Sequence, residues 1–548
     1  TYITTQIGKF TTSINYNFST LGKANTVPFH NGEYNYIESG NRLSFYGENK
    51  IDKGTFHMGN IEASYDIDTL NLITLSFGGY FFNTANNSTQ NITMTDQSGH
   101  LLYQYNEIGR NPKYQYFDFN GKIDYQHLTH RKGEALTFSY LLSTTNQENS
   151  SSVSYEDKIN FPLSYDSLSN HSNLNFYEHT FQFDWTRPFA QKHKVEMGLK
   201  YILRQNFSKT LYEYNNGVNE NTNFNHITNI GAAYAEYSFN SKHWGARAGL
   251  RYELAHLKGH YPDSDKPSFS SFIPDLVPTL SLSYKINDAN TLKLNYATRI
   301  NRPGISYLNP AVSTSPTTIS YGNPNLESTR RNLFRLSHSL MKRKIILNTS
   351  LNYAWANNSL MSLEWIEDGI RYNTFANNGK AQGFSCDIYA QWTPTKSTQL
   401  MINGSIKYQK YQNSQNLMND GWEKNIYANV KQNLPWKLIF NANIFYWQGG
   451  VTDIYSSGMD YFQYGFNLSR SFLKEDRLTV KLGAQNPFSS KYRTSTEHTT
   501  NGGRTGYYTS MSFVRAFGIN ISYRFGSLNA SVKKTNKTIS NDDLEGRK

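Results

Sequence analysis

The sequence predicts an all-β chain that forms a transmembrane antiparallel β-barrel, and two observations favour this fold class. Segments of roughly 12 to 15 residues alternate between apolar and polar side chains, which is long beside the ~5–6 residues of soluble strands. Short turns alternate with long polar links along the chain, as they do in outer-membrane barrels. A soluble two-sheet sandwich would also show alternating strands, but it has no reason to sort its links by length.

The composition excludes several other classes of protein. Aromatic residues make up 15% of the 548 residues, whereas disordered chains are poor in aromatics. The single cysteine, Cys386, excludes a disulfide scaffold and a cysteine-rich metal site. No segment reaches the ~18 apolar residues of a membrane helix. The net charge of +12 comes from scattered Lys and Arg, which favours contact with outer-membrane lipid and lipopolysaccharide over nucleic acid.

The clearest strands show which face of the wall each residue occupies. Along the chain, these strands are predicted at residues 244–254, 280–286, 292–299, 478–484 and 517–525. Within them, Leu250 and Leu282 belong to apolar series, and Ser281 belongs to the polar series. Successive side chains of a strand point to opposite faces. We therefore expect the leucines, and Cys386 beside Phe384 and Ile388, to face lipid, and Ser281 to face the lumen.

The links between strands predict the orientation of the barrel. Short links include residues 240–242, 287–290 and 342–344, and long polar links include residues 85–112 and 301–328. Short turns are periplasmic and long loops extracellular in barrels of this kind.

Counting strands by this rule gives about 21, whereas an even number is expected. The first segment, residues 2–7, and the last, near residues 511–525, would both run toward the periplasm. One outward strand before Thr1 would restore the alternation and give about 22 strands. We therefore expect residues 1–525 to form the barrel and residues 526–548, which lack apolar periodicity, to form a mobile periplasmic C-terminal tail.

Three stretches resemble a known family. They are Tyr296-Ala-Thr-Arg-Ile-Asn-Arg-Pro-Gly-Ile-Ser-Tyr-Leu-Asn-Pro310 with Tyr321-Gly-Asn-Pro-Asn-Leu326, then Gly249-Leu-Arg-Tyr-Glu253, and Ile521-Ser-Tyr-Arg-Phe-Gly526. Together they resemble Bacteroidetes-type TonB-dependent receptors of the outer membrane β-barrel family, and the resemblance covers essentially the whole chain. Two features depart from that family: Leu326-Glu-Ser-Thr329 stands where Leu-x-Pro-Glu is usual, and the plug domain and TonB box are absent from residues 1–548.

The resemblance implies a multi-pass receptor and transporter of the cell outer membrane. It would take up a bulky, scarce nutrient such as a siderophore, vitamin, oligosaccharide or peptide. An upstream plug would couple it to TonB, and a surface lipoprotein or other envelope subunits could be further partners. The alternative is a structural or accessory barrel subunit of an envelope secretion or barrel-assembly complex. An outer-membrane enzyme is disfavoured, because no catalytic set stands out in the sequence.

The candidate ligand-binding residues lie in the long link around residues 299–326. Arg299 and Arg302 could bind an anionic group, and Tyr307, Tyr321 and Asn323 could contact a sugar or an aromatic ligand. In the other interpretation, the loop packs on its neighbours, and the two arginines satisfy carboxylates of the lumen. Both interpretations stay open at this point.

No metal or cofactor site is predicted. His256 and His260 lie at a strand end without a third ligand close in sequence, so we interpret them as surface histidines. Asp263 and Asp265 lack the glycine and the downstream glutamate of a calcium loop.

The topology can be tested by labelling single cysteines on whole cells with an impermeant reagent. Cysteines placed in the links at residues 85–112 and 301–328 should react, because these links are expected outside. Arg343→Cys, in a short turn, should not. Labelling at position 343 with none in the long links would contradict the orientation.

Overall fold

The computed structural model describes residues 2–21, 29–263, 268–489, 492–526 and 531–545, and most of them form strands. The wall strands are β1 (Tyr2–Ile7), β2 (Phe10–Leu21), β4 (Arg42–Asp66), β5 (Asn71–Thr95), β6 (Leu101–Leu128), β7 (Ala135–Ile159), β8 (Ser167–Ala190), β9 (His193–Tyr214), β10 (Asn219–Asn240), β11 (Trp244–His260), β12 (Phe269–Asn287), β13 (Asn290–Pro303), β16 (Thr329–Lys342), β17 (Ile345–Glu367), β18 (Ile370–Trp392), β19 (Thr398–Asn413), β20 (Met418–Asn433), β21 (Leu438–Gln448), β23 (Asp460–Phe472), β24 (Leu478–Gln485) and β27 (Ala516–Tyr523).

The remaining elements lie in the links. They are β3 (Phe29–Tyr36), α1 (Ile305–Leu308), β14 (Ser313–Thr314), β15 (Thr318–Ser320), β22 (Ser456–Ser457), the 3-10 turn η1 (Lys474–Asp476), β25 (Tyr492–Thr499), β26 (Arg504–Phe513) and β28 (Leu544–Glu545). No helix in the described part of the chain is long and apolar enough to cross a membrane.

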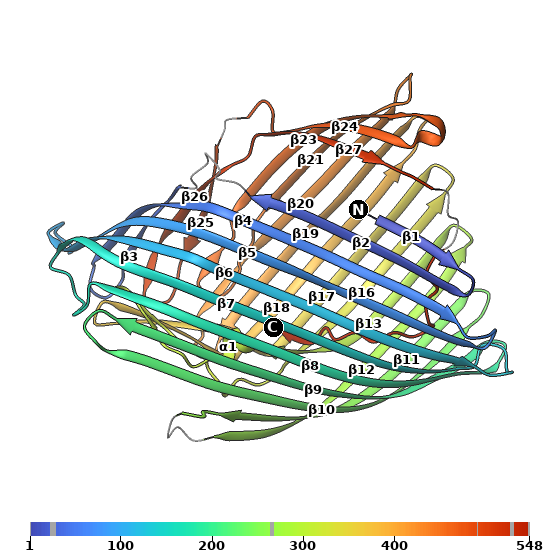
Figure 1. The fold of residues 1–548 in the computed structure, drawn as a ribbon, viewed down its shortest axis with the longest axis horizontal. Helices are drawn as coiled ribbons and strands as arrows, with labels where there is room; N and C mark the ends of the chain where they lie inside the picture. Colours follow the sequence, from blue (N-terminus) through green and yellow to red (C-terminus); the bar gives the residue numbers. More distant parts are fainter. Residues whose placement is uncertain (1, 22–28, 264–267, 490–491, 527–530, 546–548) are drawn as a thin grey trace.

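Antiparallel pairs join the wall strands in the order in which they are given above (Figure 1). Among the described residues these pairs connect 21 strands, in agreement with the strand count that the sequence predicts. The predicted antiparallel β-barrel architecture is confirmed.

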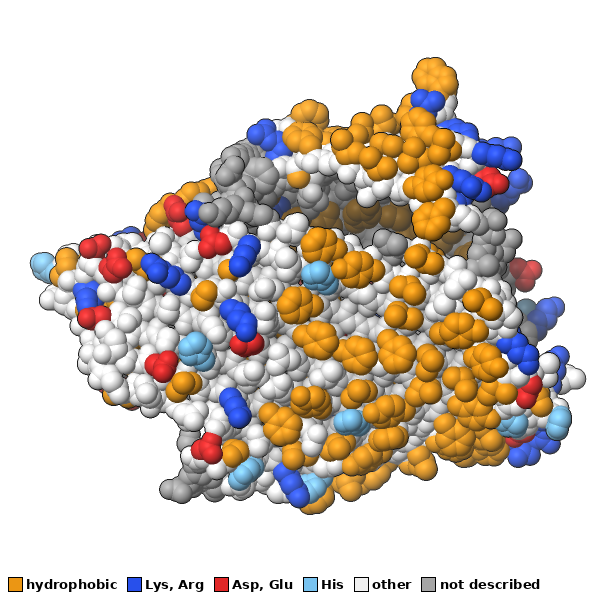
Figure 2. Space-filling model, in the orientation of Figure 1, with side chains coloured by type: hydrophobic (Ala, Val, Ile, Leu, Met, Phe, Trp, Pro, Cys, Tyr) orange, Lys and Arg blue, Asp and Glu red, His pale blue; other side chains and the backbone are white. Residues whose placement is uncertain are grey.

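The two faces of the wall differ as the alternation predicts. In β9, Lys200, Ile202 and Arg204 are buried, while their neighbours Leu199 and Tyr201 are exposed. Figure 2 shows hydrophobic side chains gathered over the lower and right part of the outer face, while polar and charged ones cover the left end. An apolar band of this kind fits the hydrocarbon layer, and the polar end fits water. Cys386, Phe384 and Ile388 are exposed in β18, as expected.

Several long links are not irregular loops, and this corrects the sequence interpretation. Residues 85–112 continue β5 and β6 as a paired hairpin that turns at residues 96–100. Residues 358–379 continue β17 and β18, which turn at Asp368 and Gly369 with φ of 49° and 77°, as a two-residue hairpin turn requires. These hairpins are rich in Asn, Ser, Thr and Gln, so they show little of the apolar alternation by which sequence analysis detects strands.

The wall is not closed by the described strands. β1 pairs only with β2, and β27 pairs only with β24. Because the number of connecting strands is odd, β1 and β27 run in the same direction. At the end of the barrel where the long links lie, a ribbon of short strands joins the two sides of the wall. In this ribbon β3 pairs with β4 and β26, and β25 pairs with β26 and β22. The opening is therefore confined to the part of the wall below this ribbon.

The C-terminal segment differs from the mobile tail that the sequence predicts. Residues 531–545 contact the inward side chains of several wall strands, and β28 pairs in parallel with the end of β13. In Figure 1 the described part of this segment, in dark red, lies within the outline of the barrel. These contacts are polar or ionic, so no apolar periodicity in the sequence signals them.

The lipid face can be tested with a pair of neighbouring substitutions. Leu282→Arg should cost about 2–4 kcal/mol of folding free energy if the residue lies near the membrane midplane. Ser281→Arg should cost much less, because this position faces the wet lumen, where an arginine stays hydrated. The hydrogen bond that Ser281 donates to the Asn295 side chain (2.7 Å) lies on that side. Reversible folding in lipid vesicles measures both values. Equal costs would show that the assigned faces are wrong.

Candidate functional site

The link between β13 and β16 folds back onto the inside of the wall. Its short helix α1 buries Ile305 and Leu308, and these residues pack with Leu326 against Phe224 and Tyr261. Burial of these apolar side chains fixes the position of the link. The sequence motif that resembles the known receptors is thus, in part, a packing motif.

Arg302 lies buried at the start of this link. Its guanidinium donates to Glu253 (2.7 Å) and to Asp543 (2.5 Å), and its backbone N–H donates to the carbonyl of Asp543 (2.6 Å). Asp275 lies 3.7 Å away. Arg302 therefore satisfies carboxylates inside the barrel, which is the packing interpretation of the sequence. It is not open to an incoming ligand in this arrangement.

Tyr307, Tyr321 and Asn323 attach the link to β18. The Asn323 side chain donates to the carbonyl of Phe375 (2.9 Å), and the backbone N–H of Tyr321 donates to the carbonyl of Asn373 (3.1 Å). The Tyr307 ring meets the Phe375 ring edge-on at 4.8 Å between centroids. Contact of these residues with a ligand remains a prediction.

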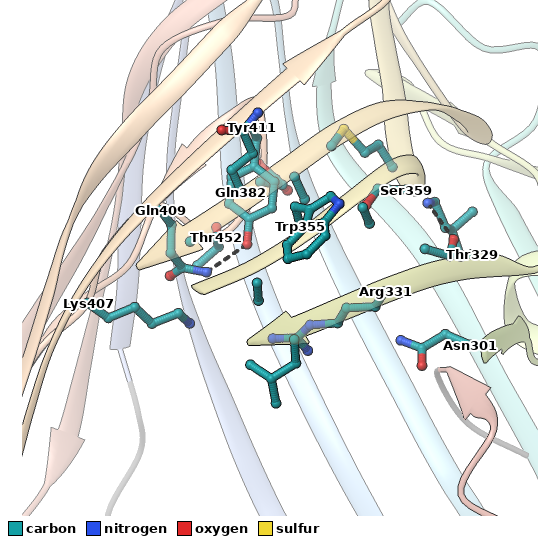
Figure 3. A pocket seen from close by; sticks show the side chains of 18 of the residues that line it. Asn301, Thr329, Arg331, Trp355, Ser359, Gln382, Lys407, Gln409, Tyr411 and Thr452 are labelled. Atoms are coloured by element: carbon teal, nitrogen blue, oxygen red, sulfur yellow. Dashed lines mark hydrogen bonds between the residues drawn. The ribbon is translucent and has the colours of Figure 1, made fainter. Parts of the chain in front are cut away.

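A hollow of about 610 Å³ lies beside the link, between Tyr307 and the inner face of β16 to β19 (Figure 3). Small residues on the inward positions of β17 and β18 leave this space free: Ala354, Ala356, Ala381 and Gly383. Longer polar side chains surround it. Figure 3 shows Arg331, contributed by β16, and Lys407 and Gln409, contributed by β19.

Three arginines form a row on the inner face of β13 and β16, here called the arginine row: Arg299, Arg331 and Arg335. Arg299 pairs directly across the ladder with Arg331, and both side chains are exposed. Within the described part of the chain, neither of these two forms a salt bridge. Like charges that face each other across a ladder destabilise the sheet. The arrangement thus fits a site that binds a negatively charged molecule.

Hydrogen-bonding groups line the hollow next to the arginine row. Arg335 donates to the side-chain oxygen of Asn352 (2.5 Å). The side-chain NH2 of Asn352 donates to Asp387 (2.5 Å) and to Ser385 (3.0 Å). This chain of bonds fixes the orientation of Arg335 and Asn352. Gln409 donates to the Tyr411 hydroxyl (2.9 Å). The lining can therefore bind an oxygen-rich molecule by charge and hydrogen bonds.

The structure places Tyr307 in the lining of this hollow and Arg299 across the ladder from Arg331, whereas Arg302, Tyr321 and Asn323 hold the link. Sequence analysis missed Arg331 and Arg335 of β16 and Lys407 of β19, because these strands lie outside the link in which the candidate residues were sought. The alternation contains a usable signal: Arg331, Leu333 and Arg335 occupy successive inward positions of one strand.

The histidines that the sequence raised as possible ligands make local contacts. The His256 ring stacks on Phe272 at 4.1 Å and bonds to Ser270 (2.9 Å), and His260 bonds to Ser268 (3.2 Å). Asp265 lies outside the described residues. The described residues contain no cluster of three or more His, Cys, Asp or Glu side chains that could hold a metal ion.

Comparison with known proteins gives a family match and several similar folds. The model of the outer membrane protein beta-barrel family matches residues 127–523. No curated protein matches the chain.

Among solved structures, the ferric yersiniabactin uptake receptor FyuA from Yersinia pestis is similar with a TM-score of 0.55 and 11% identity, over 92% of this chain and 81% of that one. The ferric citrate transporter FecA has a TM-score of 0.53 and 10% identity, over 90% of this chain and 79% of that one. The copper transporter OprC has a TM-score of 0.53 and 9% identity, over 90% and 81%. At these identities the likeness shows the fold.

The packing of the link can be tested at Gly322. A Cβ there would meet the carbonyl oxygens of Asn309 at 2.4 Å and of Tyr307 at 2.7 Å. Gly322→Ala should therefore cost about 1–3 kcal/mol and speed proteolysis within residues 301–328. Gly518→Ala is the control, because a Cβ there meets nothing within 4 Å. Equal proteolysis rates in both variants would show that the link is not held at this point.

Proposed function

The chain belongs to the outer membrane protein beta-barrel family, and from this premise we propose that it is the barrel of a Bacteroidetes-type TonB-dependent receptor that takes up a bulky, scarce and anionic nutrient. The family match assigns the chain to the outer membrane. The fold likeness to FyuA, FecA and OprC supports a receptor and transporter. The same likeness favours transport over an enzymatic activity.

The arginine row carries the proposal for the substrate class. Arg299 and Arg331 face each other across the ladder, neither forms a salt bridge among the described residues, and Arg331 lines the hollow. Guanidinium groups bind carboxylates and phosphates through paired hydrogen bonds. A bound anion would offset the repulsion between the two arginines. The free energy of anion binding should therefore be more favourable here than at a surface without facing arginines.

The proposal covers four nutrient classes: siderophores, vitamins, oligosaccharides and peptides. The arginine row favours their anionic members. FyuA and FecA are described as proteins for ferric yersiniabactin and ferric citrate. We therefore rank an anionic iron chelate first and an acidic oligosaccharide or peptide second.

The open edges of β1 and β27 support a further part of the proposal. Both edges run in the same direction, so one strand of opposite direction fits between them with antiparallel pairing on both sides. We assign this strand, and a plug domain that engages TonB, to residues upstream of Thr1. In this proposal, a surface lipoprotein or another envelope subunit is a further partner and binds the outer hairpins.

The substrate class can be tested by calorimetric binding with a panel of ferric siderophores, cobalamin, oligosaccharides and peptides of different charge. Anionic members should bind, and the double variant Arg299→Gln and Arg331→Gln should weaken them about tenfold or more. Folding stability should not fall in this variant, because like charges are removed.

Arg343→Gln is the matched control, since it removes one arginine from a short turn between β16 and β17. It should leave binding unchanged. Binding that is independent of ligand charge, or that the double variant leaves unchanged, would contradict the proposal.

A further inference from the structure

The C-terminal segment, residues 531–545, lies along the inner wall from the short-turn end of β4 to the end of β13. Lys533 pairs with Asp66 of β4 (2.7 Å), and Lys537 pairs with Glu196 of β9 (2.9 Å). Between these points the backbone N–H of Asn536 donates to the side chain of Gln126 of β6 (2.6 Å). The segment thus contacts strands that are far apart in the wall.

Further along, the segment approaches a buried arginine. The Asn541 amide donates to Glu178 (2.7 Å) and to Thr180 (2.7 Å), and Lys200 donates to the carbonyl of Ser540 (2.7 Å). Glu178 also accepts a hydrogen bond from Arg204, whose side chain is 2% exposed. These contacts fix the position of the residue that follows, Asp543.

Asp543 lies between two arginines. Its carboxylate accepts from Arg204 at 2.8 and 2.5 Å and from Arg302 at 2.5 Å. Burial alone would raise the pKa of Asp543, but the two guanidinium groups outweigh burial and lower this pKa below its ordinary value of 3.8. The contact is therefore fully present above pH 3.8 and is lost as the pH falls through the lowered value.

Without Asp543 the surrounding wall would be positively charged. Five cationic side chains and three acidic ones of the barrel meet here: Lys200, Arg204, Arg251, Arg302 and Arg330 with Glu178, Glu253 and Asp275. An arginine as buried as Arg204 cannot recover the lost contacts from bulk water. The wall at this point therefore requires a carboxylate.

We propose that residues 531–545 are a tethered acidic ligand of the lumen, which covers this part of the passage and gives way to a competing carboxylate-bearing molecule. The Arg204 and Arg302 pair is the binding site, and Asp543 is its built-in occupant. This site is distinct from the arginine row, and its test does not depend on uptake.

The character of the contacts explains why the segment can be released. In its described part, Ile539 is the one buried hydrophobic side chain, and the remaining contacts are hydrogen bonds and ion pairs. Polar contacts of this kind can be exchanged for water or for another ligand, whereas an apolar core cannot. The covalent tether keeps the segment at a high effective concentration, so a competitor is needed at high millimolar levels.

The proposal can be tested by spin-label mobility in the full chain folded in lipid vesicles. The label is placed at Ser540→Cys in a Cys386→Ser background, because the exposed Ser540 contacts the wall through its carbonyl. The unaltered segment should give an immobile spectrum. Asp543→Asn should raise the ratio of mobile to immobile label about tenfold or more. Asp542→Asn is the matched control, since Asp542 is exposed, and it should change nothing.

A competition arm tests the ligand class. Tricarballylate, a small tricarboxylate, should mobilise the label in the unaltered segment, and sucrose should not. The migration of each unheated variant in gel electrophoresis confirms that the barrel is folded. An immobile label in Asp543→Asn, equal mobility in both aspartate variants, or release by sucrose as well as by tricarballylate would overturn the proposal.

Discussion

Every backbone N–H and C=O group inside the hydrocarbon layer needs a hydrogen-bond partner, because each unsatisfied group costs several kcal/mol there. The antiparallel ladder from β1 to β27 supplies these partners for all wall strands except along the free edges of β1 and β27. At the long-link end, the ribbon of β3, β26, β25 and β22 joins the two sides of the wall. The hydrogen-bonding requirement therefore explains the long wall and supports the proposal that one more strand lies below the ribbon.

The same ladder builds the candidate site. Since side chains alternate between faces, the register of β13 against β16 places Arg299 opposite Arg331 on the lumen side. A slip of one residue would turn these arginines toward lipid. The register of β17 against β18 likewise places Ala354 beside Gly383 and leaves room for the hollow. The charge and the space of the site thus follow from strand pairing more than from any loop.

Sequence analysis identified the architecture because the lipid-facing series, such as the one containing Leu250 and Leu282, carries a strong period of two. It failed at residues 85–112, which are mostly polar although they are paired strands, and of which only Ile92, Met94 and Tyr105 are buried members of the hydrophobic core cluster. At the candidate site it named Arg299 and Tyr307, whose contact with a ligand stays a prediction. It could not foresee Arg331 and Lys407, because the pairing of distant strands cannot be read from any one segment. The docked C-terminal segment was missed because its contacts are ionic and join residues hundreds of positions apart.

Disulfide trapping between β1 and β27 in the intact protein tests most directly whether a strand lies between them. Neighbouring strands lie ~4.8 Å apart, so one intervening strand places the edges beyond disulfide reach. Cysteines at Thr4 and Ser13, whose hydroxyl oxygens are 3.3 Å apart, provide the positive control. The account predicts that this pair forms a disulfide and that Thr4→Cys forms none with cysteines at Gly518, Asn520 or Ser522. A disulfide between β1 and β27 would show direct parallel pairing and contradict the account.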